Sequence, residues 1–458
     1  MLSRLHKTFR KLEADTDENL FSYFKKTVAV TQIADQKSDR VIGVGLKGIG
    51  KTAAFRYFTD FEASPDIRVG INVYKYGLQL PNKDMNYAVC CKQFEHDIVI
   101  EALYHVTQNR KALALTGKLS KHYLDAAAKE VSTYREIITK AFGKFGGVSV
   151  LGCGFTIHHP TEEMAIGLTR TDETSNASRV LKEICDRISI RIVVDDPEWV
   201  FSVGRELDTH LIGGFCLAAL RCSVKYAGLK VIPLLKTHVY YPILLQIDDL
   251  GKYPDHMERL CWTKDELFEV IDSRLKAERC AWKDLFQGSE KDARRIVADM
   301  CLRVRNGPRD LLRWLDLALQ VSGGNKLSET EINQTYRRMS EDSFNELVSA
   351  NSVRHEKLGE LIRAIFRKDP NHKYSPAQFK KHLGDLRVRN KEFQSLTKLA
   401  WMQLETSESL PDLFFKTGAI AFEAAGNLVL PYEKGYDPET FRNASSVQLV
   451  PCLSMVMT

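Results

Sequence analysis

The chain has 458 residues, of which 44% are hydrophobic and 27% are charged, and its formal net charge at pH 7 is +6. This composition is ordinary for a soluble globular protein with a sizeable core, and the length predicts about three domains. The longest apolar stretch, residues 211–220, is too short to cross a bilayer and predicts a buried helix instead. The mild positive charge permits nucleic-acid binding without requiring it.

The spacing of the cysteines and the N-terminal residues indicate the cellular compartment of the protein. The ten cysteines lack the C-x-x-C spacing of a zinc site, and the first residues contain no apolar core of signal-peptide length. We therefore expect reduced, mostly buried thiols in a cytoplasmic protein without a membrane partner.

The first predicted element is a helix over residues 15–28. Asp15 and Glu18 have the spacing of a capping box, and Leu20, Phe21 and Phe24 would share one face. The pattern favours an ordinary packed amphipathic helix; a position beside the base of a bound nucleotide is the alternative.

Residues 45–52, GLKGIGKT, match the phosphate-binding pattern G-x-x-x-x-G-K-[ST] in full. The apolar run at 40–44 predicts a buried parallel strand before this loop, and residues 52–58 predict a helix after it. The glycines let backbone N–H groups surround a phosphate, Lys51 reaches the β and γ oxygens, and the Thr52 hydroxyl binds Mg²⁺. The expected phosphate-binding residues are Gly45, Lys47, Gly48, Ile49, Gly50, Lys51, Thr52 and Ala53.

A long segment separates this loop from the strand expected at 188–196. We expect a strand at 66–74, helices within 92–142, a hairpin or strand at 145–154, a loop at 168–176 and a helix at 177–186.

Residues 188–196 form an apolar run that ends in two carboxylates. At the end of a strand beside the loop strand, Asp195 would hold Mg²⁺ through water and Asp196 would orient or deprotonate the attacking water. Glu198 is the competing choice for the base. The alternative is a strand that runs into an ordinary acidic turn before Pro197.

The run 229–235 predicts a third strand, although Pro233 is awkward for a central one. Lys236 follows it, in a place suited to sensing the γ-phosphate, with Thr237 as the alternate. A solvated lysine at a strand end is the other interpretation.

Residues 263–325 predict a helical segment. Thr263 and Glu266 cap its first helix, and two more helices are expected at 289–303 and 308–321. Arg309 lies on the tight turn at the start of the last of these helices. From there it could reach a γ-phosphate and couple the nucleotide state to the orientation of the helical segment.

After the linker at 322–326, the pattern changes. The predicted elements are helices at 328–350, 357–366, 375–386 and 391–405, and β runs at 418–423 and 427–432. Three helices and a hairpin is the order of a winged helix. Seven basic residues (Lys373, Lys380, Lys381, Arg387, Arg389, Lys391 and Lys398) face two acidic ones between 373 and 398. This face could bind DNA phosphates, or it could be solvated or pack on a partner.

Together these motifs resemble those of ATPases of the STAND, KAP and AAA+ type. GLKGIGKT is similar to Walker A, IVVDD to a double-aspartate Walker B, residues 260–267 to the last strand leading into a helical lid, and Asn306–Arg309 to a sensor-2 turn. The chain is similar, over most of residues 15–430, to bacterial P-loop ATPases that carry a C-terminal winged helix. It departs from them at Leu46, where a polar residue is expected, and no arginine finger is evident.

The resemblance implies an α/β fold: a P-loop NTPase core with a parallel sheet, a helical lid and a C-terminal winged-helix domain. The expected domains are an N-terminal helix (1–30), the core (31–262), the lid (263–325) and the winged helix (326–458). ATP is favoured over GTP, because no Asn/Thr-Lys-x-Asp string is present.

Three functions follow from this resemblance. The first is an ATP-hydrolysing switch that uses Mg²⁺ and controls self-assembly or a protein effector, with a weaker implication of bacterial anti-phage defence. The second is a DNA-binding ATPase, and the third is a nucleotide-binding scaffold with little hydrolysis.

Overall fold

The computed structural model describes residues 2–62, 66–72, 87–109, 176–197, 206–237, 239–240, 243, 254–305, 307–352, 355–431, 433 and 438–457. Contacts within the chain divide it into two compact units. The first comprises Met1–Thr27, Gly45–Ala53 and Arg259–Thr458, and the second comprises Val28–Val44 and Ala54–Glu258. Most of the segment at 92–142, the hairpin at 145–154 and nearly all of the loop at 168–176 lie outside the described residues.

The second unit is built on a five-stranded sheet with the order β2-β3-β4-β1-β5. The strands are β1 (Ile42–Gly45), β2 (Ile67–Asn72), β3 (Ile190–Asp195), β4 (Leu229–Lys236) and β5 (Met257–Arg259). β2, β3 and β4 pair in parallel, and every residue of β3 is buried. Burial on both faces of the sheet explains why the sequences of these strands are apolar runs in which polar and apolar residues do not alternate. The parallel sheet of an α/β fold is confirmed.

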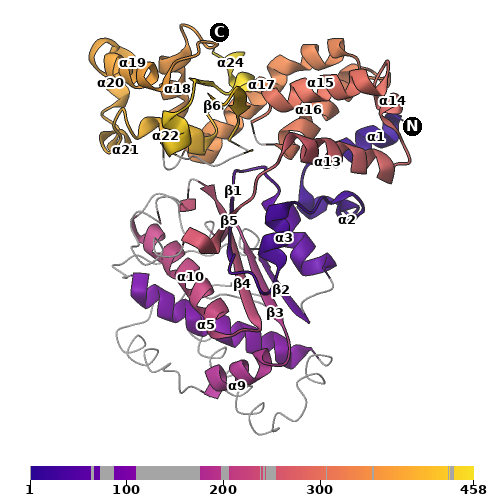
Figure 1. Cartoon of the computed structure of the whole chain (residues 1–458), viewed down its shortest axis with the longest axis vertical. Coiled ribbons are helices and arrows are strands. Elements are labelled where there is room, and N and C mark those ends of the chain that lie inside the picture. Colours follow the sequence, from indigo (N-terminus) through magenta and orange to yellow (C-terminus); the bar gives the residue numbers. More distant parts are fainter. Residues whose placement is uncertain are drawn as a thin grey trace, which may run out of the picture. The chain divides into compact units, whose positions relative to one another are not determined.

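Helices lie alongside this sheet (Figure 1). They are α3 (Val28–Ala34), α5 (Tyr87–Gln108), α9 (Asn176–Cys185) and α10 (Glu206–Lys225). The apolar stretch 211–220 lies within α10 and is fully buried, as its composition predicts. One continuous apolar core joins α5, α9 and α10 to the strands.

Pro233 lies in an inner strand, because β4 is flanked by β3 and β1. The sequence argued against this position, since proline cannot donate to a strand ladder. The strand forms nevertheless, with all residues from Leu229 to Leu235 buried. Gly43 of β1 allows β4 to pack closely against β1, because a Cβ at Gly43 would lie only 2.6 Å from Leu234 Cδ2.

In the first unit, the single helix expected at 15–28 is wrong. The segment instead forms a 3₁₀ turn (Ala14–Thr16) and the short helix α2 (Leu20–Tyr23), after an earlier helix α1 (Leu2–Phe9). Asp17 is the reason: its buried carboxylate accepts hydrogen bonds from the Asn19 N–H at 3.1 Å and from the Tyr23 hydroxyl. These local bonds compete with a continuous helix.

The helices expected within residues 263–325 are present. They are α13 (Lys264–Ala277), the additional short α14 (Trp282–Leu285), α15 (Glu290–Arg303) and α16 (Pro308–Val321). The Thr263 capping box is present in full, with Glu266 returning a 2.8 Å bond to the Thr263 N–H. The strand expected at the start of residues 260–267 ends earlier, at Arg259.

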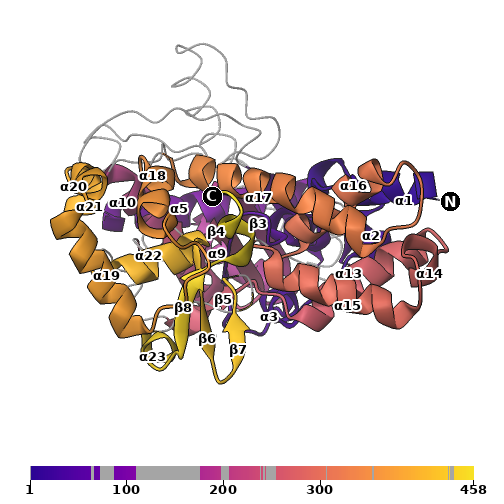
Figure 2. The ribbon, with the colours of Figure 1, turned by 90° about the horizontal axis from the view of Figure 1, so that it is seen from above.

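The C-terminal part of the first unit has the helices and antiparallel sheet of a winged helix (Figure 2). Its helices are α17 (Glu329–Asn351), α18 (Leu358–Phe366), α19 (Pro376–Arg389), α20 (Lys391–Leu396), α21 (Ala400–Gln403), α22 (Leu410–Thr417), α23 (Pro438–Arg442) and α24 (Pro451–Ser454). The sheet order is β7-β6-β8, with β6 at Ile420–Ala424, β7 at Asn427–Val429 and β8 at Ser446–Leu449.

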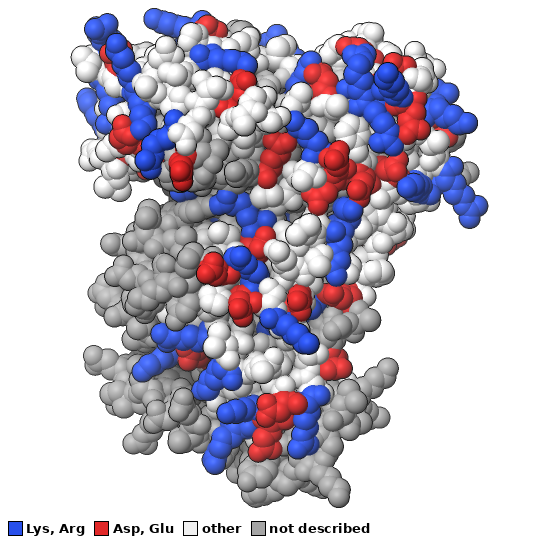
Figure 3. Space-filling model, viewed as in Figure 1, with Lys and Arg blue, Asp and Glu red and all other residues white. Residues whose placement is uncertain are grey.

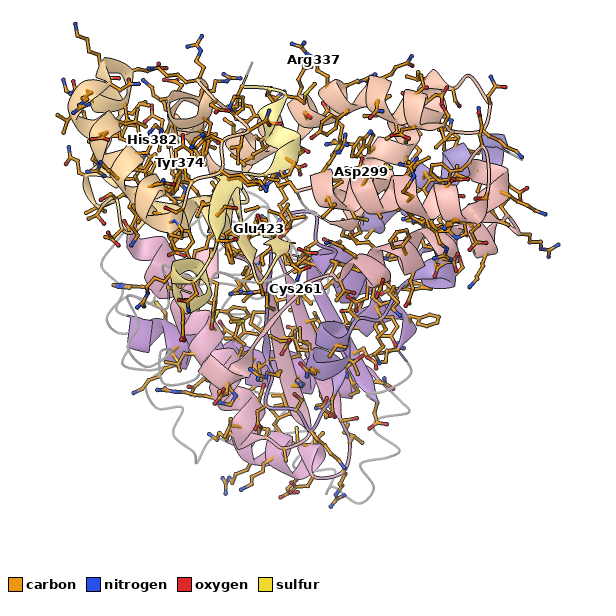
Figure 4. All side chains as sticks on the ribbon, turned by 45° about the horizontal axis from the view of Figure 1, so that its top comes forward. Cys261, Asp299, Arg337, Tyr374, His382 and Glu423 are labelled. Atoms are coloured by element: carbon orange, nitrogen blue, oxygen red, sulfur yellow. The ribbon has the colours of Figure 1, made fainter. Side chains whose placement is uncertain are left out.

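Two expectations for this part need correction. The helix expected at 391–405 is two short helices, α20 and α21, and the expected hairpin gains a third strand, β8, on the other side of β6. The contacts of Tyr374 fix β8 near α19. The Tyr374 N–H donates to the Val447 carbonyl at 2.9 Å, and its ring stacks on His382 (Figure 4).

Candidate nucleotide site

The phosphate loop connects β1 to α4 (Lys51–Arg56), which continues as a π-helical turn at Tyr57–Phe61. Gly48 and Gly50 have φ angles of +86° and +104°, a region in which a side chain would be strained. These conformations turn the backbone sharply within the loop, as the strand–loop–helix order of the sequence predicts.

Lys51 is the first residue of α4, and its side chain is buried. Its Nζ donates to two carbonyl oxygens of its own loop, Gly45 at 3.2 Å and Leu46 at 3.1 Å. The ammonium group is therefore held inside the loop. Thr52, half-buried, follows it in the first turn of the helix.

Trp262 holds the loop from a position remote in the sequence. Its indole Nε1 donates to the Ile49 carbonyl at 2.7 Å, and its ring lies 3.8 Å from where a Cβ on Gly50 would be. Trp262 directly precedes Thr263, the cap of α13. Trp262 was expected between the sheet and the helices at 263–325, but no local sequence pattern signals its contact with the loop.

Arg309 and Lys47, both expected near the nucleotide, share a partner that the sequence analysis missed. The partner is Glu346 of α17: its Oε1 lies 2.9 Å from Arg309 Nη1 and 3.5 Å from Lys47 Nζ, and its Oε2 lies 3.7 Å from Arg313 Nη1. Burial raises the pKa of Glu346, but Arg305, Arg309, Lys47 and Arg313 together outweigh burial and lower that pKa below its usual value. The phosphate loop, α16 and α17 thus meet at one carboxylate.

In the second unit, the structure brings together two residues predicted to be catalytic. Asp196 follows β3 with a φ of +50°, and Lys236 ends the neighbouring β4. Lys236 Nζ lies 3.5 Å from Asp196 Oδ1. The carboxyl ends of parallel strands meet at one edge of a sheet, which explains this pairing.

Asp195, the predicted Mg²⁺ residue, is the last residue of β3 and is completely buried. The expectation that its strand lies beside the loop strand is wrong, because β4 lies between β3 and β1. It lies in register with Leu234 on β4. Thr237, the alternate to Lys236, is buried, and Glu198, the competing base, lies outside the described residues.

The described residues include no group of three or more His, Cys, Asp or Glu that could hold a metal by itself. The predicted Mg²⁺ ligands are one hydroxyl, of Thr52, and one carboxylate, of Asp195. Oxygen donors of this kind suit Mg²⁺, which usually keeps several waters and shares substrate phosphates rather than binding in an all-protein cage. Each of the two side chains, taken by itself, carries an oxygen donor of the type that Mg²⁺ prefers.

The basic residues of the C-terminal part are partly neutralised within the chain. Lys373 lies 3.3 Å from Glu423 and Lys380 pairs with Glu408, whereas Arg387 donates only to the uncharged main-chain carbonyl of Glu405. Figure 3 shows acidic side chains among the basic ones on the C-terminal helices. Phe393 of α20 is fully buried.

Within the described part of the chain, no helix has both the length and the apolar character needed to cross a bilayer. Most of the cysteine side chains described there are buried.

No protein-family model matches this chain, and no curated protein matches it. Among solved structures, it is similar to the Walker-type ATPase PABY2304 of Pyrococcus abyssi, with 10% identity, 95% of each chain covered and a TM-score of 0.45. It is also similar to the ORC2 protein of Aeropyrum pernix, solved as ADPNP–ADP complexes (10% identity, 93% of this chain and 96% of that chain, TM-score 0.38). A third similar structure is Cdc6p from Pyrobaculum aerophilum (13% identity, 95% of each chain, TM-score 0.32). Since all three TM-scores are below 0.5, these similarities assign no function or residue role to this chain.

Proposed function

We propose that this protein is a P-loop ATPase that binds MgATP and acts as a switch. The observation that carries the proposal is the phosphate loop itself. It combines a complete GLKGIGKT string, a strand before it, a helix after it, two glycines with positive φ and a buried Lys51 directed at the loop carbonyls. Backbone N–H groups and an ammonium group in this arrangement suit a polyphosphate.

Each chain residue has a defined task in this proposal. Lys51 would leave the carbonyls of Gly45 and Leu46 to bind phosphate oxygens, and Thr52 and Asp195 would hold the metal. Mg²⁺, when bound, neutralises charge that develops on the transferred phosphoryl group. Asp196 would orient the attacking water and accept its proton, while Lys236 holds the Asp196 carboxylate in place.

The charge around Glu346 supports a phosphate-binding role for the lid. Lys47, Arg309 and Arg313 share one carboxylate, which leaves excess positive charge close to the phosphate loop. An additional anion would be attracted there. We propose that Arg309 contributes to binding the γ-phosphate.

Calorimetric titration of the purified chain with ATP, with and without Mg²⁺, tests nucleotide binding, and phosphate release tests turnover. Binding that requires neither Mg²⁺ nor Lys51 would contradict the proposal. Titration with GTP in parallel tests the preference for ATP.

A scaffold that binds nucleotide and hydrolyses little is the second candidate, supported by the Lys236–Asp196 ion pair. The ammonium group of Lys236 lies against Asp196 Oδ1, an oxygen that would otherwise be available to the attacking water. Turnover that stays below one per hour (roughly 3 × 10⁻⁴ s⁻¹, like an unstimulated GTPase) despite tight binding would favour it.

The proposal extends to self-assembly or control of a protein effector, with bacterial anti-phage defence as one setting. Gel filtration with ADP and with a non-hydrolysable ATP analogue tests assembly. A DNA-binding ATPase is less well supported, because the basic residues Lys373 and Lys380 already pair with carboxylates in the chain. Turnover stimulated by DNA with a steep salt dependence would reverse that preference.

A further inference from the structure

Glu346 is a carboxylate surrounded by cations from two other segments. Its side chain is only 10% exposed and lies in the interior of the 23-residue helix α17. Lys47 comes from the phosphate loop, and Arg309 and Arg313 come from the first two turns of α16. No sequence motif singled out this residue.

The arrangement matters because Glu346 takes the place that a phosphate would take. A carboxylate and a phosphate oxygen are both bound by guanidinium and ammonium groups through charge-assisted hydrogen bonds. Lys47 and Arg309 are two of the residues expected to meet the nucleotide, and both approach the same atom, Oε1, at 3.5 Å and 2.9 Å. An anion that bound these two cations would compete with Glu346 for them.

Whether a nucleotide competes with Glu346 depends on the number of phosphates that the nucleotide carries. Lys51, inside the loop, serves the β- and γ-phosphates, whereas Arg309 lies on a different segment, at the start of α16. A nucleoside diphosphate has no γ-phosphate to offer to Arg309. Only a triphosphate would therefore compete with Glu346 for Arg309.

We propose that Glu346 is an internal counter-anion that occupies Lys47 and Arg309 in the nucleotide-free protein and yields them to the γ-phosphate of a nucleoside triphosphate. This inference rests on the proposed function. Glu346 thereby opposes triphosphate binding and contributes to discrimination between ATP and ADP. Loss of its two contacts also releases α17, the first helix of the C-terminal part, from the phosphate loop.

The test is the substitution Glu346→Gln, which keeps the side-chain shape and removes the charge. The dissociation constants of MgATP and MgADP are measured by titration for the wild type and the variant. We expect ATP to bind roughly 5- to 100-fold more tightly to the variant, the usual range for coupling between two binding events, and ADP affinity to change less than about 2-fold. A purely structural ion pair would change both affinities alike.

Glu341→Gln is the matched control, because Glu341 lies on the same helix and pairs with exposed Arg337, which projects from α17 (Figure 4). It should leave the ratio of the ADP and ATP dissociation constants unchanged. Circular dichroism and thermal unfolding show whether each variant is folded. If Glu346→Gln is unfolded, Glu346→Asp keeps the charge, shortens the reach by one methylene and should shift the ratio in the same direction.

The outcomes separate this inference from the proposed function. A wild type that binds no nucleotide overturns both. A wild type that binds MgATP, with a folded Glu346→Gln variant whose ratio is unchanged or whose ATP binding is weaker, overturns only the role of Glu346. A folded Glu346→Asp variant with the wild-type ratio does the same.

Discussion

The indole nitrogen of Trp262 donates a 2.7 Å hydrogen bond to the carbonyl oxygen of Ile49 in the phosphate loop. Trp262 is the residue before the Thr263 cap of α13, so the loop and the first lid helix are joined through one side chain. A displacement of the start of α13 would be transmitted to the loop backbone through this hydrogen bond. In the proposed switch, this bond gives the lid a direct influence on phosphate binding.

Removing that hydrogen bond should weaken nucleotide binding. Trp262→Phe leaves an aromatic ring but no donor, and a hydrogen bond contributes about 0.5–1.5 kcal/mol, so we expect MgATP affinity to fall by roughly 3- to 10-fold. Trp401→Phe is the control, because Trp401 Nε1 donates to the Glu356 carbonyl, in the C-terminal part of the chain. Equal affinity losses in the two variants, measured by titration, would argue against a specific role for Trp262.

Lys51→Ala should abolish nucleotide binding. In the proposed site, the ammonium group that lies inside the loop binds the β- and γ-phosphates. Titration with MgATP checks this expectation. Lys276→Ala, which removes an exposed lysine of α13, is the control and should bind like the wild type. Nucleotide binding by Lys51→Ala at wild-type affinity would show that the loop is not the site.

Asp196→Asn should keep nucleotide binding and lose turnover. A positioned general base contributes roughly 10²- to 10⁴-fold to a rate, and the amide cannot accept the proton. Phosphate release under saturating MgATP measures the loss, and Asp186→Asn, at an exposed position after α9, serves as the control. If both Lys51→Ala and Asp196→Asn hydrolyse ATP at the wild-type rate, the catalytic assignment is wrong.

Lys230 should give the stability of the fold a characteristic pH dependence. Burial lowers the pKa of this β4 lysine from 10.5 to about 8, with a further contribution from Arg191, although its Nζ donates to the Ser38 carbonyl at 3.1 Å. Between pH 8 and 10.5 the unfolded chain therefore binds more protons at this position than the folded chain. The contribution of Lys230 to the free energy of unfolding must rise with pH across that interval.

The substitution Lys230→Met removes this term. The free energy of unfolding of the wild type, minus that of the variant, should increase by about 2–3 kcal/mol between pH 8 and 10.5. Urea unfolding at several pH values measures the difference, which also cancels the titration of buried thiols common to both proteins. Lys182→Met, at an exposed position on α9, should show no such trend. A difference that is constant with pH would contradict the lowered pKa.

The thiols should differ sharply in reactivity. Burial raises the pKa of Cys90, Cys185 and Cys301 to about 12, so these thiols stay protonated at neutral pH, whereas Cys261 and Cys280 are only half-buried. Iodoacetamide at pH 8, followed by peptide mass spectrometry, should label Cys261 and Cys280 first. In urea, all five should react alike. Native labelling of Cys90 as fast as Cys261 would contradict the buried position.

Prediction from the sequence was most successful where the signal is local. The Thr263 box, the helices at 289–303 and 308–321, and the buried α10 each follow from residues within about one helix length. It failed where a tertiary contact overrides the local pattern. Asp17 is the clearest case, because its carboxylate contacts Arg274 of α13 in addition to its local bonds with Asn19 and Tyr23, and the expected helix at 15–28 is interrupted there.

By itself, the sequence determined the phosphate loop, because the glycines, Lys51 and Thr52 lie in one contiguous stretch of chain. Such a loop needs only a strand before it and a helix after it. The tertiary structure decided which side chains meet. Glu346 lies about three hundred residues after Lys47, and Trp262 more than two hundred after Ile49, yet each pair is in contact. Such contacts arise from how whole helices and strands pack, and no short sequence pattern encodes a partner at that separation.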